Sequence, residues 1–483
     1  MNGNLTKVTG NAGIHPQFSA MRFLKRQTRR FRLAWQSLLP RRFHHLKLHT
    51  QVVMICVYVT VFLNILYGVY LGRFSLRRKK FLFSKVVTIY SIFVATIFGT
   101  CYIWNIYKEL YAGQISSRHT IGIYCYMNVF VCLFNYVTQW VLTGQIIRFQ
   151  NKIPLFKVLN SLDMSVKIVW KAVTLTILKI FICPLIGYIT LILYQKRTQP
   201  DSQWTSLTTV RTMLPLIVSN QINNCFFGSL VIANAIVAAI NQKVHVIVKE
   251  ANKMQSSVQM DLNKPYYRMR RFCELADRLD ELAEKYCLTA GCSKVSFNLY
   301  MFNVKVFKFF SFSNNTIAHF KNQTVYMFQL SKRYVRFTDC SMVLSMLMNL
   351  IGITMGFYNQ YLAIADYYIN EEPFDLFLAI VLLIFLAVPF LELVMVARIS
   401  NQTLLETRRT GDLLQRLDLQ HTDVRFKQVV NAFWLRVAII DYKLMPLGLL
   451  ELSTSLVNKV FSAVTGYLLI LIQSDLTLRF SLK

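Results

Sequence analysis

The sequence predicts an all-α membrane protein with seven transmembrane helices and a cytosolic N-terminus. Of its 483 residues, 54% are hydrophobic and only 16% are charged, and the mean hydropathy is +0.39. Soluble domains carry roughly 25% charged residues. The apolar residues are gathered into runs of about twenty, the length that a helix needs to cross the hydrocarbon core of a bilayer. A large soluble core does not require such runs, so a membrane protein is the better interpretation.

The strong positive charge fits the same fold class. A net charge of +31 would point to nucleic acid in a soluble chain. In membrane proteins, however, Lys and Arg accumulate on cytoplasmic loops because they set the orientation of the helices. We therefore expect no nucleic-acid partner.

Seven apolar runs are the predicted spans. They lie at 84–107, 121–144, 171–194, 209–240, 341–368, 376–398 and 455–473. An eighth run, 51–72, is long enough to cross but has basic residues on both flanks. A crossing would place one basic block outside the cell, against the orientation bias. We therefore predict that 51–72 lies in the cytosolic interface or is partly inserted, with eight spans as the alternative.

Loop charges predict the orientation. Residues 1–50 are basic and lack the short apolar core of a signal peptide, so this arm is expected in the cytosol. With seven spans, the basic segments 145–170 and 241–337 then lie inside, and the acidic loop 369–375 lies outside. This pattern agrees with a cytosolic N-terminus.

The long segment 241–337 divides into two parts. Between 270 and 286, apolar residues recur at three- and four-residue spacing, which predicts an amphipathic helix. These residues are Leu275, Leu279, Leu282 and Tyr286. The helix could pack against its own chain or against another subunit. The second part, 293–334, contains no acidic residue, and it could lie against anionic lipid or be an insertion without a structural role.

The last span differs from the others. Only Val460–Ile472 is cleanly apolar, and Lys459 precedes it while Gln473 and Asp475 follow it. Polar residues are costly in lipid and often mark an ion pathway. The helix could therefore line a water-filled pore, or it could be a tilted helix with snorkelling ends.

No enzyme motif is present, and we expect no catalytic residues, no cofactor and no metal site. Cys287 and Cys292 lack a second Cys or His pair at zinc spacing. Among the charged residues within spans, Glu392 is expected to pair with Arg398, and Asp366 is expected to reach the outer interface. The scarcity of acids at mid-depth argues against an ion-coupled transporter.

Polar side chains in the middle and outer parts of the central spans are candidates for a ligand pocket, because such pockets are mostly apolar with a few placed polar groups. The candidates are Tyr126, Asn128, Tyr188, Asn220, Asn224, Tyr358, Asn359 and Tyr361. Alternatively, Tyr is common at membrane interfaces, and amide side chains often hold helices together.

The C-terminal stretch resembles the insect gustatory receptor family. That family's signature is Thr-Tyr, five hydrophobic residues and Gln-Phe, and here Tyr467 is followed by five hydrophobic residues and Gln473. Gly466 replaces the Thr and Ser474 replaces the Phe. Pro446-Leu447-Gly448 and Leu66-Tyr67-Gly68 also look like the family, and the layout agrees over roughly 51–290 and 335–480. G-protein-coupled receptors fit less well, because the chain has no Asp-Arg-Tyr and no Asn-Pro.

The resemblance implies a tetrameric ligand-gated cation channel with a central pore formed by the last helices. The pore and gate residues carried over from the motif are Tyr467, Ile472, Gln473, Ser474 and Leu476. Because Ser474 is too small and polar to form an apolar plug, Ile472 or Leu476 could take that role. The implied partners are a small-molecule tastant, with bitter compounds as one guess, and other gustatory receptor subunits in a homo- or heterotetramer. The implied location is the plasma membrane of sensory neurons.

The expected domain layout follows from these points. It comprises a basic cytosolic arm (1–50), an interfacial helix and basic linker (51–83), transmembrane helices 1–4 (84–240), a cytosolic loop with the amphipathic helix and a possible gene-model insertion (241–340), transmembrane helices 5–6 (341–398), a cytosolic helical anchor region (399–454), and the pore-lining helix with a short external C-terminus (455–483). A seven-span metabotropic receptor and a secondary transporter remain the alternative functions.

Overall fold

The computed structural model describes residues 47–75, 78, 80–111, 120–152, 155–198, 205–255, 265–295, 315–370, 373–439, 444–446, 449 and 451–481, with 290–295 and 315–338 described by their backbone alone. The chain divides into two compact units, Met1–Ile55 and Cys56–Lys483. All packing reported below lies within the second unit.

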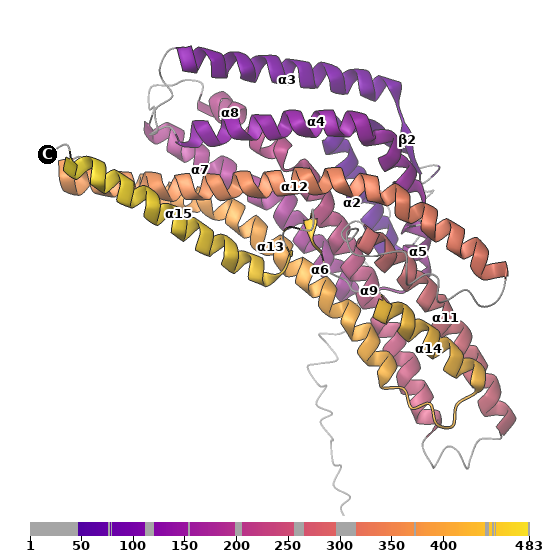
Figure 1. Ribbon diagram of the computed structural model, residues 1–483. Coiled ribbons are helices and arrows are strands. Elements are labelled where there is room, and N and C mark those ends of the chain that lie inside the picture. Colours follow the sequence, from indigo (N-terminus) through magenta and orange to yellow (C-terminus); the bar gives the residue numbers. More distant parts are fainter. Residues whose placement is uncertain are drawn as a thin grey trace, which may run out of the picture. The chain divides into compact units, whose positions relative to one another are not determined.

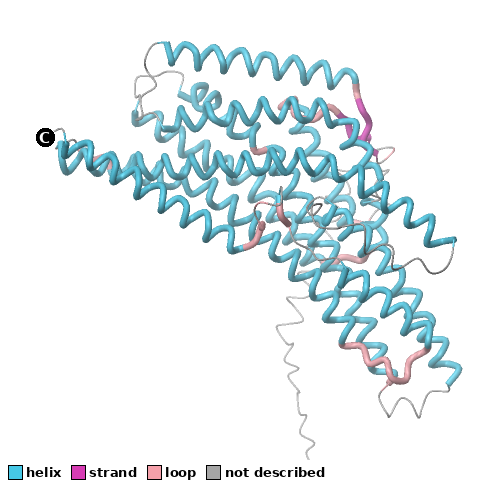
Figure 2. Tube along the Cα trace, in the orientation of Figure 1, coloured by secondary structure: helices cyan, strands magenta, loops and turns pink. Residues whose placement is uncertain are grey.

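The described part of the chain is almost entirely helical (Figures 1 and 2). In chain order the elements are α2 (Leu48–Leu66), β1 (Gly72–Ser75), β2 (Lys80–Phe83), α3 (Lys85–Tyr111), α4 (Thr120–Lys152), α5 (Leu155–Ser161), α6 (Val166–Ile177), the π-helical turn η2 (Leu178–Ile182), α7 (Cys183–Thr198), α8 (Thr205–Ser219), α9 (Gln221–Met254), α11 (Pro265–Val295), α12 (Asn315–Asn370), α13 (Leu376–Gln415), α14 (Val424–Ile439) and α15 (Thr454–Ser481).

Eight helical segments in the described residues are long and apolar enough to cross a membrane. Seven of them overlap the predicted spans, although the fourth predicted span, 209–240, also includes most of α8. This confirms the helical membrane fold class. The eighth is His49–Leu66, the segment predicted to lie in the interface. Length and composition alone qualify it as a span, so its interfacial placement stays a prediction, as does the cytosolic N-terminus.

The linker after α2 forms a structure that the sequence interpretation missed. Gly68 has a φ of 71°, a conformation that favours glycine, and it turns the chain after α2. Residues 72–83 then form an antiparallel hairpin in which Phe74 pairs with Phe81. The all-α prediction is therefore corrected by one short two-stranded sheet.

Several helices extend beyond the predicted spans. The fifth predicted span, 341–368, is part of the 56-residue helix α12, which begins at Asn315. The last predicted span, 455–473, is part of α15, which continues to Ser481. Of the possible insertion at 293–334, residues 296–314 lie outside the described residues, and the insertion itself stays a prediction.

Two of the predicted spans are not regular α-helices throughout. The third contains the π-helical turn η2 between α6 and α7. In the fourth, Pro215 lies inside α8 and cannot donate to the carbonyl of Arg211 four residues earlier. The hydroxyl of Tyr102 donates to that carbonyl at 2.5 Å. The interruption in α8 is thus compensated by a hydrogen bond from α3.

The helix predicted between 270 and 286 is part of α11. Its four predicted apolar residues are all buried. They pack within the chain, since Phe272 lies 5.5 Å from Phe426 of α14 and Tyr286 lies 5.6 Å from Phe433 between ring centroids. Figure 1 shows α11 and α14 beside the ends of α9 and α13. The apolar face of α11 is therefore covered by its own chain.

Ion pairs reinforce this bundle at its surface. Arg271 donates to Glu250 of α9 and to Glu274, with Nη1 2.7 Å from Glu274 Oε2. The hydrogen bond from Arg271 lowers the pKa of the Glu274 carboxyl below its ordinary value, and the same carboxylates raise the pKa of the Arg271 guanidinium. Both groups stay charged at neutral pH.

Candidate functional site

A buried ion pair lies at the centre of the helix bundle. Nζ of Lys179, in η2, is 3.2 Å from Oε2 of Glu392 in α13, and their side chains are 1% and 7% exposed. A charge withdrawn from water must be paired and hydrogen-bonded. Lys179 also lies over the ring of Phe227 of α9, 5.6 Å from its centroid. One pair therefore joins η2 and α13, with α9 beneath the cation.

The predicted pairing of Glu392 with Arg398 is wrong. Six helical residues correspond to about 600° of rotation, so the two side chains point to different sides of α13. Glu392 is buried while Arg398 is exposed. The sequence did not indicate Lys179 as the partner of Glu392, because Lys179 lies 213 residues away from it within an otherwise apolar run.

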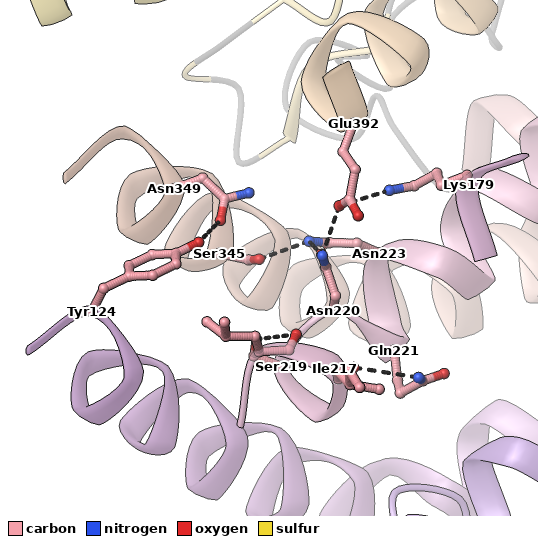
Figure 3. A network of polar contacts seen from close by, with 11 residues as sticks. Tyr124, Lys179, Ile217, Ser219, Asn220, Gln221, Asn223, Ser345, Asn349 and Glu392 are labelled. Atoms are coloured by element: carbon pink, nitrogen blue, oxygen red, sulfur yellow. Dashed lines mark hydrogen bonds and ion pairs between the residues drawn. The ribbon is translucent and has the colours of Figure 1, made fainter. Parts of the chain in front are cut away.

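Amide side chains of the fourth span extend the network toward α12 (Figure 3). Nδ2 of Asn220 donates to Glu392 Oε2 at 2.6 Å. Nδ2 of Asn223 donates to Asn220 Oδ1 at 3.1 Å and to Ser345 Oγ at 2.7 Å. Asn220 lies at the break between α8 and α9, so the break positions an amide beside the buried carboxylate.

A second group of hydrogen bonds connects α4 to its neighbours. The hydroxyl of Tyr124 donates to Asn349 Oδ1 of α12 at 2.8 Å. Oγ of Ser219, at the end of α8, donates to Asn128 Oδ1 at 2.8 Å. Asn128 in turn donates to the backbone oxygen of Tyr124 at 2.9 Å. Figure 3 shows Tyr124 and Asn349 close to the Asn223–Ser345 contact.

Two acceptors in this region have no partner within the described chain. They are Oδ1 of Asn223 and Oδ1 of Asn224, both buried. An unsatisfied buried acceptor costs about 1–3 kcal/mol. Chemically, the two oxygens are able to accept hydrogen bonds from a molecule that reaches this part of the bundle.

The eight predicted pocket residues do not form one cluster. Asn220 belongs to the group around Glu392 and Asn128 to the neighbouring group around Ser219 and Tyr124, and we call these two groups together the central network. Asn224 lies next to Asn223 in α9. Tyr188 packs against the apolar cluster of Leu191, Met213 and Phe385. Tyr358 and Tyr361 stack with centroids 6.0 Å apart near α15. Within the part of the chain that the structure describes, Tyr126 and Asn359 join neither group.

The last helix is the least covered of the candidate spans. Only 11% of the residues in its most apolar 18-residue stretch are buried, against 22–61% for the corresponding stretches of the other candidate spans. Tyr467 is 58% exposed, and Gln473 and Ser474 are exposed, whereas Ile472 and Leu476 are partly buried. Three of the five predicted pore residues thus point away from the chain's own bundle.

A charged cluster attaches the end of α15 to α12. Nη1 of Arg479 lies 2.8 Å from Asp366 Oδ1, and Nε of Arg479 lies 2.8 Å from Asp475 Oδ2. The hydroxyl of Tyr361 donates to Asp475 Oδ2 at 3.1 Å. Asp366 is buried and paired with Arg479, and its placement at the outer interface stays a prediction. Arg479 was missed because the predicted span ended at 473.

Comparisons with known proteins address the family. The chain matches the family described as 7tm Chemosensory receptor over residues 52–329 and 326–478. It is 70% identical to the Drosophila melanogaster protein described as gustatory receptor 97a, over 96% of this chain and all of that one. It is 33% identical to Drosophila melanogaster gustatory receptor 94a, over 90% of this chain and 98% of that one.

Solved structures with a similar fold are olfactory receptors. The insect olfactory receptor OR5 from Machilis hrabei in complex with eugenol matches with a TM-score of 0.53 at 10% identity, covering 88% of this chain and 99% of that one. A second structure of OR5 from Machilis hrabei matches with a TM-score of 0.50 at 8% identity and the same coverage. At this identity the likeness shows a shared fold.

Proposed function

Because the chain belongs to the insect gustatory receptor family, we propose that it is a subunit of a ligand-gated, non-selective cation channel opened by a small-molecule tastant, with bitter compounds as the first class to test. The channel is a homo- or heterotetramer of gustatory receptor subunits in the plasma membrane of sensory neurons. Its N-terminus lies in the cytosol, and α11 and α14 belong to the cytosolic anchor.

The observation that carries this proposal is the exposure of α15. An apolar helix with 11% of its most apolar stretch buried needs lipid or another subunit along most of its surface. Its polar residues, including the exposed Gln473, would be costly against lipid alone. A central pore surrounded by four copies of α15 accommodates both the apolar and the polar residues of this helix. The apolar faces pack between subunits, and the polar end meets water.

The central network is the proposed ligand region. Asn220 and Asn224 lie where α4, η2, α9, α12 and α13 meet, and the free Oδ1 atoms of Asn223 and Asn224 suit a ligand with hydrogen-bond donors. A ligand that binds one arrangement of these helices more tightly shifts the population toward it. The cluster of Asp366 and Arg479 then connects α12 to the pore helix.

Excised-patch recording tests the channel function. We expect a panel of bitter compounds to evoke cation current in patches without added nucleotide, from this chain alone or with other gustatory receptor subunits. A current that disappears when G-proteins are blocked would favour a metabotropic receptor instead. Ligand-coupled uptake without current would favour a transporter.

Replacing Gln473 tests the pore assignment. We expect Gln473→Glu to alter the relative permeability of cations at least about threefold, because an added carboxylate at a pore changes the local field, and Gln473→Ala to change the conductance. The matched control is Gln415→Ala, an exposed glutamine at the end of α13, which should leave both unchanged. If conductance and selectivity of both Gln473 variants equal those of the unmodified channel, Gln473 does not line the pore.

A further inference from the structure

The β1–β2 hairpin is held firmly on one side. Phe74 lies 4.9 Å from Phe81 and 5.5 Å from Phe156 of α5, between ring centroids. The side-chain amide of Asn151, at the end of α4, donates to the backbone oxygen of Phe81 at 2.7 Å and accepts from its N–H at 2.8 Å. Tyr70, just before β1, donates to Gln150 Oε1 at 2.8 Å. The hairpin is thus fixed to the end of α4.

The other side of the hairpin carries basic residues. Successive side chains of a strand point to opposite faces. In the observed register Arg73 is opposite Leu82 and Ser75 is opposite Lys80, so Arg73 and Lys80 lie on the face away from Phe74 and Phe81. Together with Arg78 and Lys85, which follow in the turn and at the start of α3, they are all exposed. We call these four residues the basic surface.

No carboxylate in the surrounding sequence neutralises the basic surface. The first acidic residue of the whole chain is Glu109, and the next is Asp163. The hairpin, α2, α4 and α5 therefore contain no carboxylate at all. None of the ion pairs found among the described residues includes a member of the basic surface.

The basic surface lies where α3 enters the apolar part of its span. Lys85 is the first residue of α3, a candidate span of 27 residues. Directly after it, Val86, Ile89 and Phe93 are 76%, 69% and 62% exposed, as lipid-facing side chains of a spanning helix are. When α3 spans a bilayer, basic residues directly before its lipid-facing side chains are at the level of the phospholipid headgroups. Phe83, also exposed, adds an apolar contact at the same level.

We propose that Arg73, Arg78, Lys80 and Lys85 form a docking surface for the headgroups of anionic phospholipids in the cytosolic leaflet. The leaflet supplies the missing negative charge, because it is rich in anionic lipid and attracts basic segments next to a span. The positive charges of the Arg and Lys side chains attract the phosphate oxygens of the headgroups. The proposal rests on the cytosolic orientation in the proposed function, but not on ligand gating.

Lipid binding to the full-length receptor in neutral detergent tests the proposal. The probe is dioctanoyl phosphatidylinositol 4,5-bisphosphate, with dioctanoyl phosphatidylcholine as the neutral comparison. We expect the variant Arg73→Gln/Arg78→Gln/Lys80→Gln to bind the anionic probe at least tenfold more weakly, since each base near an anionic surface contributes about a fivefold change in affinity. The charge-conserving variant Arg73→Lys/Arg78→Lys should remain within about threefold of the unmodified protein.

The matched control removes three exposed positive charges elsewhere. Arg278→Gln/Arg408→Gln/Arg416→Gln changes α11 and the end of α13 and should leave the affinity unchanged. Equal binding of the anionic probe by the hairpin variant and the unmodified protein would overturn the proposal. So would an equal loss in the control variant, or equal binding of phosphatidylcholine.

A measurement on the unmodified protein keeps the proposal testable if the hairpin variant fails to fold. A photoactivatable anionic lipid in nanodiscs should cross-link to the peptide spanning residues 72–93, and cross-links confined to other peptides would overturn the proposal. Labelling of Arg78→Cys by an impermeant maleimide in intact cells would contradict the orientation. Neither experiment uses a tastant or records current, so a failure of the channel function leaves both outcomes readable.

Discussion

Lys179 and Glu392 show how two charges can lie inside an apolar bundle. The pair is completed by the amide of Asn220 and by the ring of Phe227. Removing one partner leaves the other charge buried and alone, which costs more than removing both. The asymmetry makes the pair testable through its single and double variants.

We expect Glu392→Gln and Lys179→Met each to destabilise the receptor by about 3–5 kcal/mol, because each leaves a buried group without its counter-charge. The double variant should be more stable than either single variant. The measurement is the thermal unfolding midpoint in detergent, with expression at the cell surface as a second readout. Arg398→Gln is the control, since Arg398 is exposed on another side of α13. Additive effects in the double variant would contradict the coupling.

Arg479 connects α15 to α12 through Asp366, beside the hydrogen bond from Tyr361 to Asp475. We expect Arg479→Gln to loosen the last turns of α15, so that amide hydrogen exchange of residues 470–481 accelerates roughly fivefold, equivalent to about 1 kcal/mol for one lost hydrogen bond. The control is Thr477→Ala, whose hydroxyl donates only to the backbone oxygen of Gln473 in its own helix. Unchanged exchange in Arg479→Gln would show that the cluster does not hold the helix end.

At the scale of elements, α11 and α14 form a packed unit with the ends of α9 and α13. Their contact depends on residues such as Leu279, which has no exposed surface. The amphipathic spacing of α11 predicted these residues correctly. The spacing could not predict which element covers the apolar face of α11, because such a face can pack against any complementary apolar surface.

We expect Leu279→Ala to destabilise this unit by about 2–5 kcal/mol, the usual cost of removing a large buried aliphatic side chain. Limited proteolysis should cut within 265–295 and 424–439 at lower protease concentration than in the unmodified receptor. Leu405→Ala on α13 is the control, because Leu405 is 55% exposed. Equal protease resistance of the two variants would mean that the α11 contact contributes little to stability.

For the whole molecule, the sequence predicted the spans well because each span is a continuous run of apolar residues and can be recognised without knowledge of its neighbours. The hairpin was missed since its strands have only four residues each and lie within a basic run. The end of α15 was misplaced at 473 because Asp475 looks like a stop signal until Arg479 and Tyr361 are known to lie beside it.

The candidate site was predicted in its composition but not in its geometry. Asn128 and Asn220 were identified as polar residues in apolar runs, and the structure places both in the central network. Lys179 could not be paired with Glu392, because their contact depends on how η2 packs on α13. Likewise, the separation of Tyr361 from Asn220 follows from helix packing, which no local pattern records.

Pro389 lies inside α13, three residues before Glu392, and removes one backbone hydrogen bond at that level. A 40-residue helix is about 60 Å long, so any tilt of α13 near the buried charge pair gives a larger displacement at the ends of the helix. At a distance of about 30 Å from Glu392, a tilt of roughly 2° moves the C-terminal end of α13 by about 1 Å. A small tilt of α13 around Glu392 would therefore move the helix further at the place where it meets α14.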